Sequence, residues 1–185
     1  LIACVKEDKC DGEPKTDSPV STSPTMSPST TAPIVSTSTC TAYGDPHYRT
    51  FDAHLFHFQG QCEYVLAKDC SGESRIPFEV QVRNSNTSPV STTVAVAIRF
   101  TNGDVVELFR GSQIGSIHKF NGAGLPALPY IDGQQNSITV NAAKNHFVVK
   151  VPSVGAVVEW NTRSAVWVHL NDSSPLRNNS CGLCG

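Results

Sequence analysis

The sequence is poor in the features that build long helices, membrane spans and charged binding surfaces. It contains one Met among 185 residues, and no stretch has the periodicity of a long amphipathic helix. No apolar run approaches the roughly 18 residues that a membrane-spanning helix needs. The 14 Lys and Arg residues are nearly balanced by 16 Asp and Glu residues, without a basic stripe or an acidic tail. These absences exclude a membrane span in this sequence and the charge pattern of nucleic-acid-binding proteins.

The sequence also lacks a complete set of catalytic residues. It contains no G-x-S-x-G elbow, no phosphate-binding loop and no H-E-x-x-H zinc motif. His54 and His57, with His47 nearby, invite a zinc interpretation. Residues three apart on a strand face opposite sides, however, so this spacing suits joint metal ligation poorly. We therefore expect surface or partly buried histidines and no enzyme.

Cysteine is the residue type that carries the first clear signal. The widely separated cysteines fit long-range disulfides in an oxidising compartment better than a metal or redox site of a cytosolic protein. An odd count leaves at least one thiol free or paired outside this chain, which we expect to be a fragment of a longer polypeptide. The seven cysteines are Cys4, Cys10, Cys40, Cys62, Cys70, Cys181 and Cys184.

Composition divides the chain into three parts. Residues 1–16 are predicted to be the tail of a preceding cysteine-containing module. Residues 17–39 include 13 Ser or Thr and four Pro, which predicts an extended, mucin-like, O-glycosylated linker, with an unmodified linker as the alternative. Residues 40–185 form the third part. Three N-x-S/T sequons in predicted loops, which begin at Asn86, Asn171 and Asn178, support a secreted, extracellular glycoprotein.

Residues 40–185 alternate between short strand-like stretches and turns. An Asn-Gly-Asp turn at 102–104 separates two such stretches, as in a β-hairpin. About eight to ten strands at this spacing predict an all-β domain, an antiparallel β-sandwich or barrel-like fold. Trp160 and Trp167 are both expected to anchor its core. The expected strands lie at 77–83, 93–100, 105–109, 137–140, 146–151, 157–160 and 165–170.

Two segments are specific enough to indicate a family, one within residues 40–66 and one at residues 181–185. Residues 40–52 read CTAYGDPHYRTFD, and residues 56–66 read FHFQGQCEYVL. The chain closes with CGLCG at 181–185. In this order, with a strand-rich region between them, these segments resemble the von Willebrand factor type D domain. The resemblance runs from Cys40 to Gly185 and leaves residues 1–39 outside.

The resemblance implies how the cysteines pair. Cys181-x-x-Cys184 also invites a redox interpretation, but it follows a strand and a polar loop without the βαβ context of such motifs, which favours two stabilising bridges. The implied pairs are Cys40 with Cys184, Cys70 with Cys181, and Cys62 with a cysteine beyond Gly185, with Cys4 and Cys10 left as a separate local pair.

The resemblance also implies a calcium site and a cleavable bond. Asp52 would supply one carboxylate to calcium, with the remaining ligands in residues beyond Gly185. Family members usually have Gly where this chain has Ala53, which would strain the turn if the position needs positive φ. In some mucin-type members a G-D-P-H sequence, here beginning at Gly44, is cleaved between Asp and Pro in mild acid. A structural role for Asp45-Pro46 is the alternative.

The sequence favours a structural and interaction module of a secreted mucin-like or matrix glycoprotein. Its expected partners are extracellular matrix or mucin-type proteins, including copies of itself. The alternative is a regulator that binds a growth factor of the bone morphogenetic protein type, because such regulators contain a domain with a closely similar F-Q-G-x-C-x-Y-V-L run. A third hypothesis, thiol–disulfide or self-cleaving enzyme activity, lacks a complete catalytic constellation.

Overall fold

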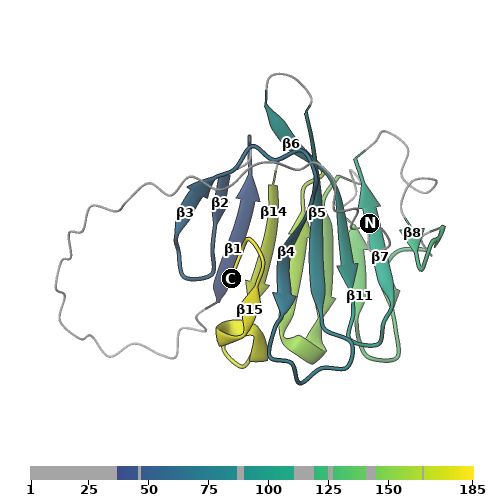
Figure 1. Ribbon diagram of the computed structural model, residues 1–185. Helices are drawn as coiled ribbons and strands as arrows, with labels where there is room; N and C mark the ends of the chain where they lie inside the picture. The colour runs from purple at the N-terminus through teal and green to yellow at the C-terminus, as the bar shows by residue number, and fades with distance from the viewer. Residues whose placement is uncertain are drawn as a thin grey trace, which may run out of the picture.

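The domain consists of two antiparallel β-sheets that lie face to face (Figure 1). The structure, a computed structural model, describes residues 37–45, 47–86, 90–110, 119–124, 127–140, 145–163 and 165–185. The predicted all-β sandwich is confirmed. In this described part of the chain, no helix has the length and apolar character needed to cross a bilayer.

In each sheet, neighbouring strands run antiparallel to one another. The first has the spatial order β10 (Tyr130–Ile131), β11 (Ser137–Val140), β12 (Phe147–Val151), β13 (Ala156–Trp160), β14 (Ala165–Leu170), β1 (Ser38–Tyr43), β2 (His47–Arg49) and β3 (Leu55–His57). The second has the order β15 (Ser180–Cys181), β4 (Glu63–Asp69), β5 (Glu79–Asn86), β6 (Ser91–Arg99), β7 (Val105–Phe109), β8 (Lys119–Phe120) and β9 (Ala123–Gly124). Two short 3-10 turns, η1 (Pro152–Val154) and η2 (Pro175–Asn178), follow β12 and β14.

The long strands form where the sequence alternates between apolar and polar residues. Every second residue then points to the same face, so one apolar set is buried between the sheets. The hairpin turn at 102–104 joins β6 to β7, and Gly103 adopts φ 94°, which favours glycine. The first sheet contributes buried residues such as Phe147, Val149 and Val168, and the second contributes Val80, Val96 and Ile98.

The two tryptophans lie on different faces of the first sheet. Trp160 on β13 is 1% exposed and belongs to the core, as predicted. Trp167 on β14 is only partly buried, because its neighbours Val166 and Val168 occupy the inward positions. The expectation that Trp167 anchors the core is therefore wrong, and the period-two pattern of β14 accounts for its outward position.

A buried polar chain connects the two sheets. The Asn84 side chain on β5 donates from Nδ2 to the hydroxyl of Tyr48 on β2, at 2.9 Å, and accepts from Thr93 Oγ1 on β6, at 3.0 Å. Tyr48 is fully buried and stacks on Phe56, with ring centroids 5.2 Å apart. Burial raises the pKa of Tyr48 to about 12, so its hydroxyl stays protonated near neutrality. This chain fixes β2 against the second sheet.

Replacing Tyr48 with Phe should destabilise the domain by about 1–3 kcal/mol, because the buried Asn84 amide loses its acceptor. Urea unfolding at neutral pH measures this change. The matched control is Tyr43→Phe, which removes the same hydroxyl from a side chain that is 40% exposed and should change stability by less than about 0.5 kcal/mol. Equal effects of the two substitutions would contradict the proposed role of the buried chain.

Candidate functional site

The C-terminal turn joins both sheets through disulfide bonds. Cys184 is bonded to Cys40 on β1 of the first sheet, with the Cα atoms 5.6 Å apart. Cys181 is bonded to Cys70, which directly follows β4 of the second sheet, with the Cα atoms 5.9 Å apart. Both bonds are those that the resemblance implies. We call this pair of bonds the disulfide clamp, and it forms where β15 lies beside β4 (Figure 1).

Backbone hydrogen bonds hold the C-terminal turn against β4 in addition to the disulfide bonds. Leu183 and Cys184 donate N–H groups to the carbonyls of Val65 and Leu66, at 3.0 and 2.9 Å. Gly182 adopts φ 103°, and a Cβ atom at this position would lie 2.7 Å from the Val65 oxygen. Only glycine fits there, which explains the second letter of the CGLCG segment.

The clamp closes two long loops, with sequence separations of 144 and 111 residues. In the chain-entropy view, each bond alone stabilises the fold by at most about 5 kcal/mol, because it restricts the unfolded chain. The shorter loop is nested inside the longer one, so the two contributions are not additive. The two cysteines of the Cys-x-x-Cys motif therefore form separate long-range disulfide bonds, as the structural interpretation predicted.

The described residues show only in part how the remaining cysteines are bonded. Cys62 is also disulfide-bonded, to a partner outside the described residues. The implied bond of Cys62 with a cysteine beyond Gly185 stays a prediction. The expected local pair of Cys4 and Cys10 lies outside the described residues, as do the preceding-module tail at 1–16 and most of the linker.

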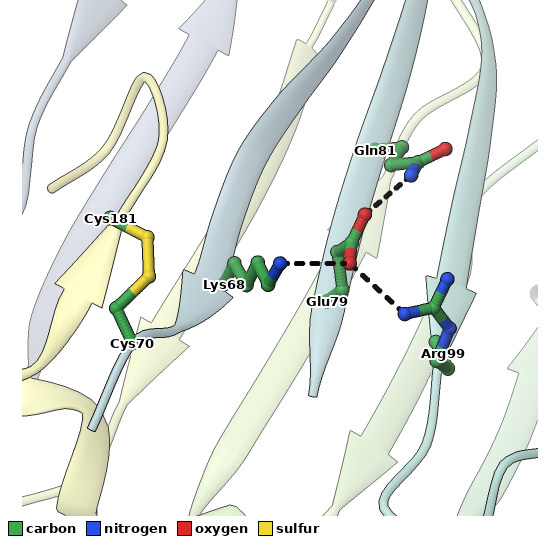
Figure 2. A network of polar contacts seen from close by, with 6 residues as sticks. All are labelled: Lys68, Cys70, Glu79, Gln81, Arg99 and Cys181. Atoms are coloured by element: carbon green, nitrogen blue, oxygen red, sulfur yellow. Dashed lines mark hydrogen bonds and ion pairs between the residues drawn. A yellow bond between two sulfur atoms is a disulfide. The ribbon is translucent and has the colours of Figure 1, made fainter. Parts of the chain in front are cut away.

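A buried carboxylate supports the end of β4 next to the second bond of the clamp. Lys68, Glu79 and Arg99 stand opposite one another on β4, β5 and β6, in a row that continues to Cys181 on β15. The Glu79 side chain is 6% exposed, and its Oε2 atom lies 3.2 Å from Arg99 Nη1 and 4.0 Å from Lys68 Nζ, as Figure 2 shows. Its other oxygen accepts a hydrogen bond from Gln81. Alternating charges across neighbouring strands favour a single register, so this row holds β4 in place.

Asp52 lies in a hollow beside the first bond of the clamp. The hollow is lined by Ser38, Phe51, Asp52, Arg177, Asn178, Ser180, Cys184 and Gly185. Phe51 donates its N–H to the Cys184 carbonyl at 3.1 Å, which brings the Asp52 turn to the end of the chain. A hydrogen bond from the Thr50 hydroxyl is the main cause of the lowered pKa of Asp52, so its carboxylate is ionised near neutrality.

The described residues do not form a calcium shell around Asp52. Calcium takes six to eight oxygen ligands, and this hollow offers one carboxylate together with neutral oxygens and the cationic side chain of Arg177. Within the described ranges, no group of three or more His, Cys, Asp or Glu side chains could hold a metal ion. The calcium role of Asp52 stays a prediction.

Ala53 occupies a backbone conformation that favours glycine. Its φ is 69°, and its N–H donates to the Thr50 carbonyl at 3.1 Å across the turn. The sequence predicts strain at Ala53 if this position needs a positive φ, and the structure shows that it does. The left-handed conformation costs a residue with a Cβ atom about 1–2 kcal/mol.

Asp45 lies in the turn between β1 and β2, where two histidines meet. Its Oδ1 atom is 3.0 Å from Nε2 of His47, a half-buried residue of β2. The opposite ring nitrogen of His47 is hydrogen-bonded to Nδ1 of His57, which faces it across the β2–β3 pair. Pro46 lies outside the described residues. Cross-strand register thus brings His47 and His57 together, whereas the spacing of His54 and His57 drew attention in the sequence.

A second histidine cluster lies on the outward face of β13 and β14 in the first sheet. The Glu159 carboxylate on β13 lies 2.9 Å from His146 Nε2 and 3.7 Å from His169 Nε2. Trp167 stacks beside His146, with ring centroids 6.3 Å apart. Sequence analysis missed this cluster, although Glu159 and Trp167 are directly paired across β13 and β14.

The three sequons lie at strand and turn ends rather than uniformly in loops. Asn171 directly follows β14 and is exposed, and its Oδ1 atom accepts a hydrogen bond from Ser173 at 3.1 Å. Asn178 is exposed at the end of η2. Asn86 is the last residue of β5 and pairs with Ser91 of β6, so its expected loop position is wrong. Glycan occupancy at all three stays a prediction.

Comparison with known proteins agrees with these features. Residues 40–185 match a family model described as the von Willebrand factor type D domain. The chain is 30% identical to human Mucin-5AC over 146 residues (79% of the chain), 34% identical to chicken SCO-spondin over 149 residues (80%) and 34% identical to human IgGFc-binding protein over 194 residues (100%). It spans only 2–3% of the length of these relatives.

Replacing Ala53 with Gly should stabilise the domain by about 0.5–1 kcal/mol, because relief of the left-handed strain outweighs the extra freedom of glycine in the unfolded chain. The free energy of unfolding in urea measures the gain. Ala123→Gly on β9 is the control, since Ala123 is an exposed strand residue without positive φ, and glycine there should destabilise by roughly 0.5–1 kcal/mol. Destabilisation by both substitutions would contradict the strain at Ala53.

Proposed function

The chain belongs to the von Willebrand factor type D domain family, and on that premise we propose that it is a structural and interaction module of a secreted, disulfide-bonded, mucin-like or matrix glycoprotein. It acts in assembly, adhesion or matrix organisation. The observation that carries this proposal is the disulfide clamp, which closes the sandwich covalently between both sheets. A closed, cross-linked domain suits an oxidising extracellular setting.

The proposed mechanism is steric and multivalent. The clamp keeps the two sheets from opening, so the outward faces stay in a fixed shape for contact with partners. The Ser/Thr/Pro-rich residues 17–39 would space this module from its neighbour and carry hydrating glycans. Repeated weak contacts between such modules give useful avidity without a tight single site. The partners proposed are mucin-type or matrix proteins and copies of the chain itself.

Two further roles remain narrower proposals. The alternative of a growth-factor regulator rests on the run from Phe58 to Leu66 alone. Calcium binding through Asp52 would require more oxygen ligands than line the hollow beside the clamp.

Cleavage of the Asp45–Pro46 bond is the second candidate function, and the contact between the Asp45 carboxylate and His47 favours it. The carboxylate is tethered to its own carbonyl carbon, so its attack is effectively unimolecular. Nε2 of His47 contacts the carboxylate at 3.0 Å, and the acidic medium supplies the proton that the departing proline nitrogen takes up. This reaction is a single self-cleavage and requires no substrate turnover.

The disulfide clamp determines whether the two products of such a cleavage separate. Cys40 lies before the Asp45–Pro46 bond and Cys184 lies after it, and the two are bonded to each other. The two fragments would therefore stay linked after cleavage. The domain would gain a new chain end at Pro46 without losing its first strand.

The assembly proposal predicts concentration-dependent self-association, or saturable binding to an immobilised mucin-type glycoprotein, with an affinity of roughly micromolar or weaker. Sedimentation velocity and surface plasmon resonance on the secreted, oxidised chain measure these. A variant in which Cys40 and Cys184 are both Ala is the control and should lose binding with its closed fold. A chain that stays monomeric and binds neither itself nor the mucin probe would overturn the proposal.

The cleavage proposal predicts that mild acid, at about pH 5–6, converts the chain into two fragments that separate only after reduction. Intact mass without reductant should rise by one water, and reduction should release residues 1–45 from residues 46–185. Asp45→Asn removes the carboxylate and should abolish the conversion. A single uncleaved species after reduction would count against cleavage.

A further inference from the structure

The Gln59 side chain is held between two backbone groups. Its Nε2 atom donates to the carbonyl oxygen of Asp45 at 2.7 Å, and its Oε1 atom accepts from the N–H of Ser91 at 3.1 Å. A backbone N–H can only donate and a carbonyl oxygen can only accept, so these two partners fix which end of the amide is which. The amide N–H of Gln59 must therefore point at the Asp45 carbonyl.

The second sheet holds Gln59 in this position. Ser91 is the first residue of β6, and its hydroxyl donates to the carbonyl of Gly60 at 2.6 Å. Gly60 has no room for a side chain, because a Cβ atom there would lie 2.1 Å from the hydroxyl of Tyr64. Gly60 and Ser91 are thus tied to each other next to the amide, while the Asp45 turn joins β1 and β2 of the first sheet. Gln59 lies in the segment between β3 of the first sheet and β4 of the second, and its amide connects Ser91 of β6 to the Asp45 carbonyl.

That carbonyl belongs to the bond whose cleavage is proposed above. We propose that Gln59 is a catalytic residue of the Asp45–Pro46 cleavage, where its amide stabilises the negative charge that develops on the Asp45 carbonyl oxygen. This inference rests on the proposed cleavage. A hydrogen bond to an oxyanion is about twice as strong as one to a neutral carbonyl, so the contact stabilises the transition state more than the ground state.

The reaction balances with water as the only co-reactant. A carboxylate oxygen of Asp45 forms a bond to its own backbone carbonyl carbon, and the π electrons move to the carbonyl oxygen facing Gln59. When the carbonyl re-forms, the bond to the Pro46 nitrogen breaks, and that nitrogen takes its electron pair and a proton from the acidic medium. Water then opens the cyclic anhydride of Asp45, leaving two carboxyl groups on Asp45 and a free amino end at Pro46.

Two histidines complete the surroundings of Asp45. His47 contacts the attacking carboxylate, and His57 contacts the far side of the His47 ring. Gln59 contacts the carbonyl instead. The carboxylate and the carbonyl of one residue therefore have separate partners, one titratable and one neutral at every pH. An amide does not titrate, so the contribution of Gln59 in the native chain is independent of pH.

The test compares Gln59→Glu with Gln61→Glu in the full chain. Glutamate at position 59 keeps an oxygen for the Ser91 N–H but cannot donate to the carbonyl while ionised. Gln61→Glu adds the same charge two residues away on an exposed side chain. We expect Gln59→Glu to cleave about 10- to 100-fold more slowly than the native chain at about pH 6, and Gln61→Glu to match the native chain. Rates come from reducing gels and mass spectrometry.

A pH series separates catalysis from support of the fold. A protonated glutamic acid can donate a hydrogen bond, so the deficit of Gln59→Glu should shrink between about pH 6 and pH 4, as the acid gains its proton. A purely structural role would not restore the rate in this way. Gln59→Ala, which can never donate, should stay slow across the range, and thermal unfolding confirms that each variant is folded.

The outcomes distinguish the two proposals. A native chain that is not cleaved would overturn the cleavage and the role of Gln59 together. A native chain that is cleaved, with Gln59→Glu and Gln59→Ala as fast as Gln61→Glu, would overturn only the role of Gln59. Equal slowing by Gln59→Glu and Gln61→Glu would also overturn it, because the cause would then be charge alone.

Discussion

The disulfide clamp is the constraint on which the rest of the domain depends. Two cysteines three positions apart bind opposite layers of the sandwich, Cys184 to β1 and Cys181 to the end of β4. Backbone hydrogen bonds from Leu183 and Cys184 to β4 complete the same junction. A five-residue segment therefore fixes the separation of two sheets that share no strand.

The Asp52 site adjoins this junction, and the Asp45 turn follows the far end of the strand that carries Cys40. The Asp52 turn is bonded to the Cys184 carbonyl through Phe51, and the Asp45 turn joins β1, which carries Cys40, to β2. The buried chain from Tyr48 to Asn84 and the bridge from Asp45 through Gln59 to Ser91 add two polar links between the sheets near β2. The covalent frame thus positions turns that combine an exposed acidic side chain with fixed backbone groups, which suits binding and local chemistry more than turnover of a diffusing substrate.

The sequence predicted the features that are local or periodic. Alternation over five or more residues predicted the position of strands such as β7 and β14, and the family resemblance predicted the two pairs of the clamp. Strands of two or three residues, such as β8 and β15, are too short to show a period. The contacts of Gln59 span 14 and 32 residues, and those of His47 depend on the register of β2 against β3, so neither was readable from spacing. Trp167 is different, because the alternation of β14 already placed it outward.

Peptide mapping of the secreted, folded chain without reductant tests the central claim most directly. The account predicts one linked peptide pair that contains Cys40 with Cys184 and another that contains Cys70 with Cys181. Crossed pairs, with Cys40 joined to Cys181, or free thiols at all four positions in properly folded material, would contradict the covalent frame and every function argued from it.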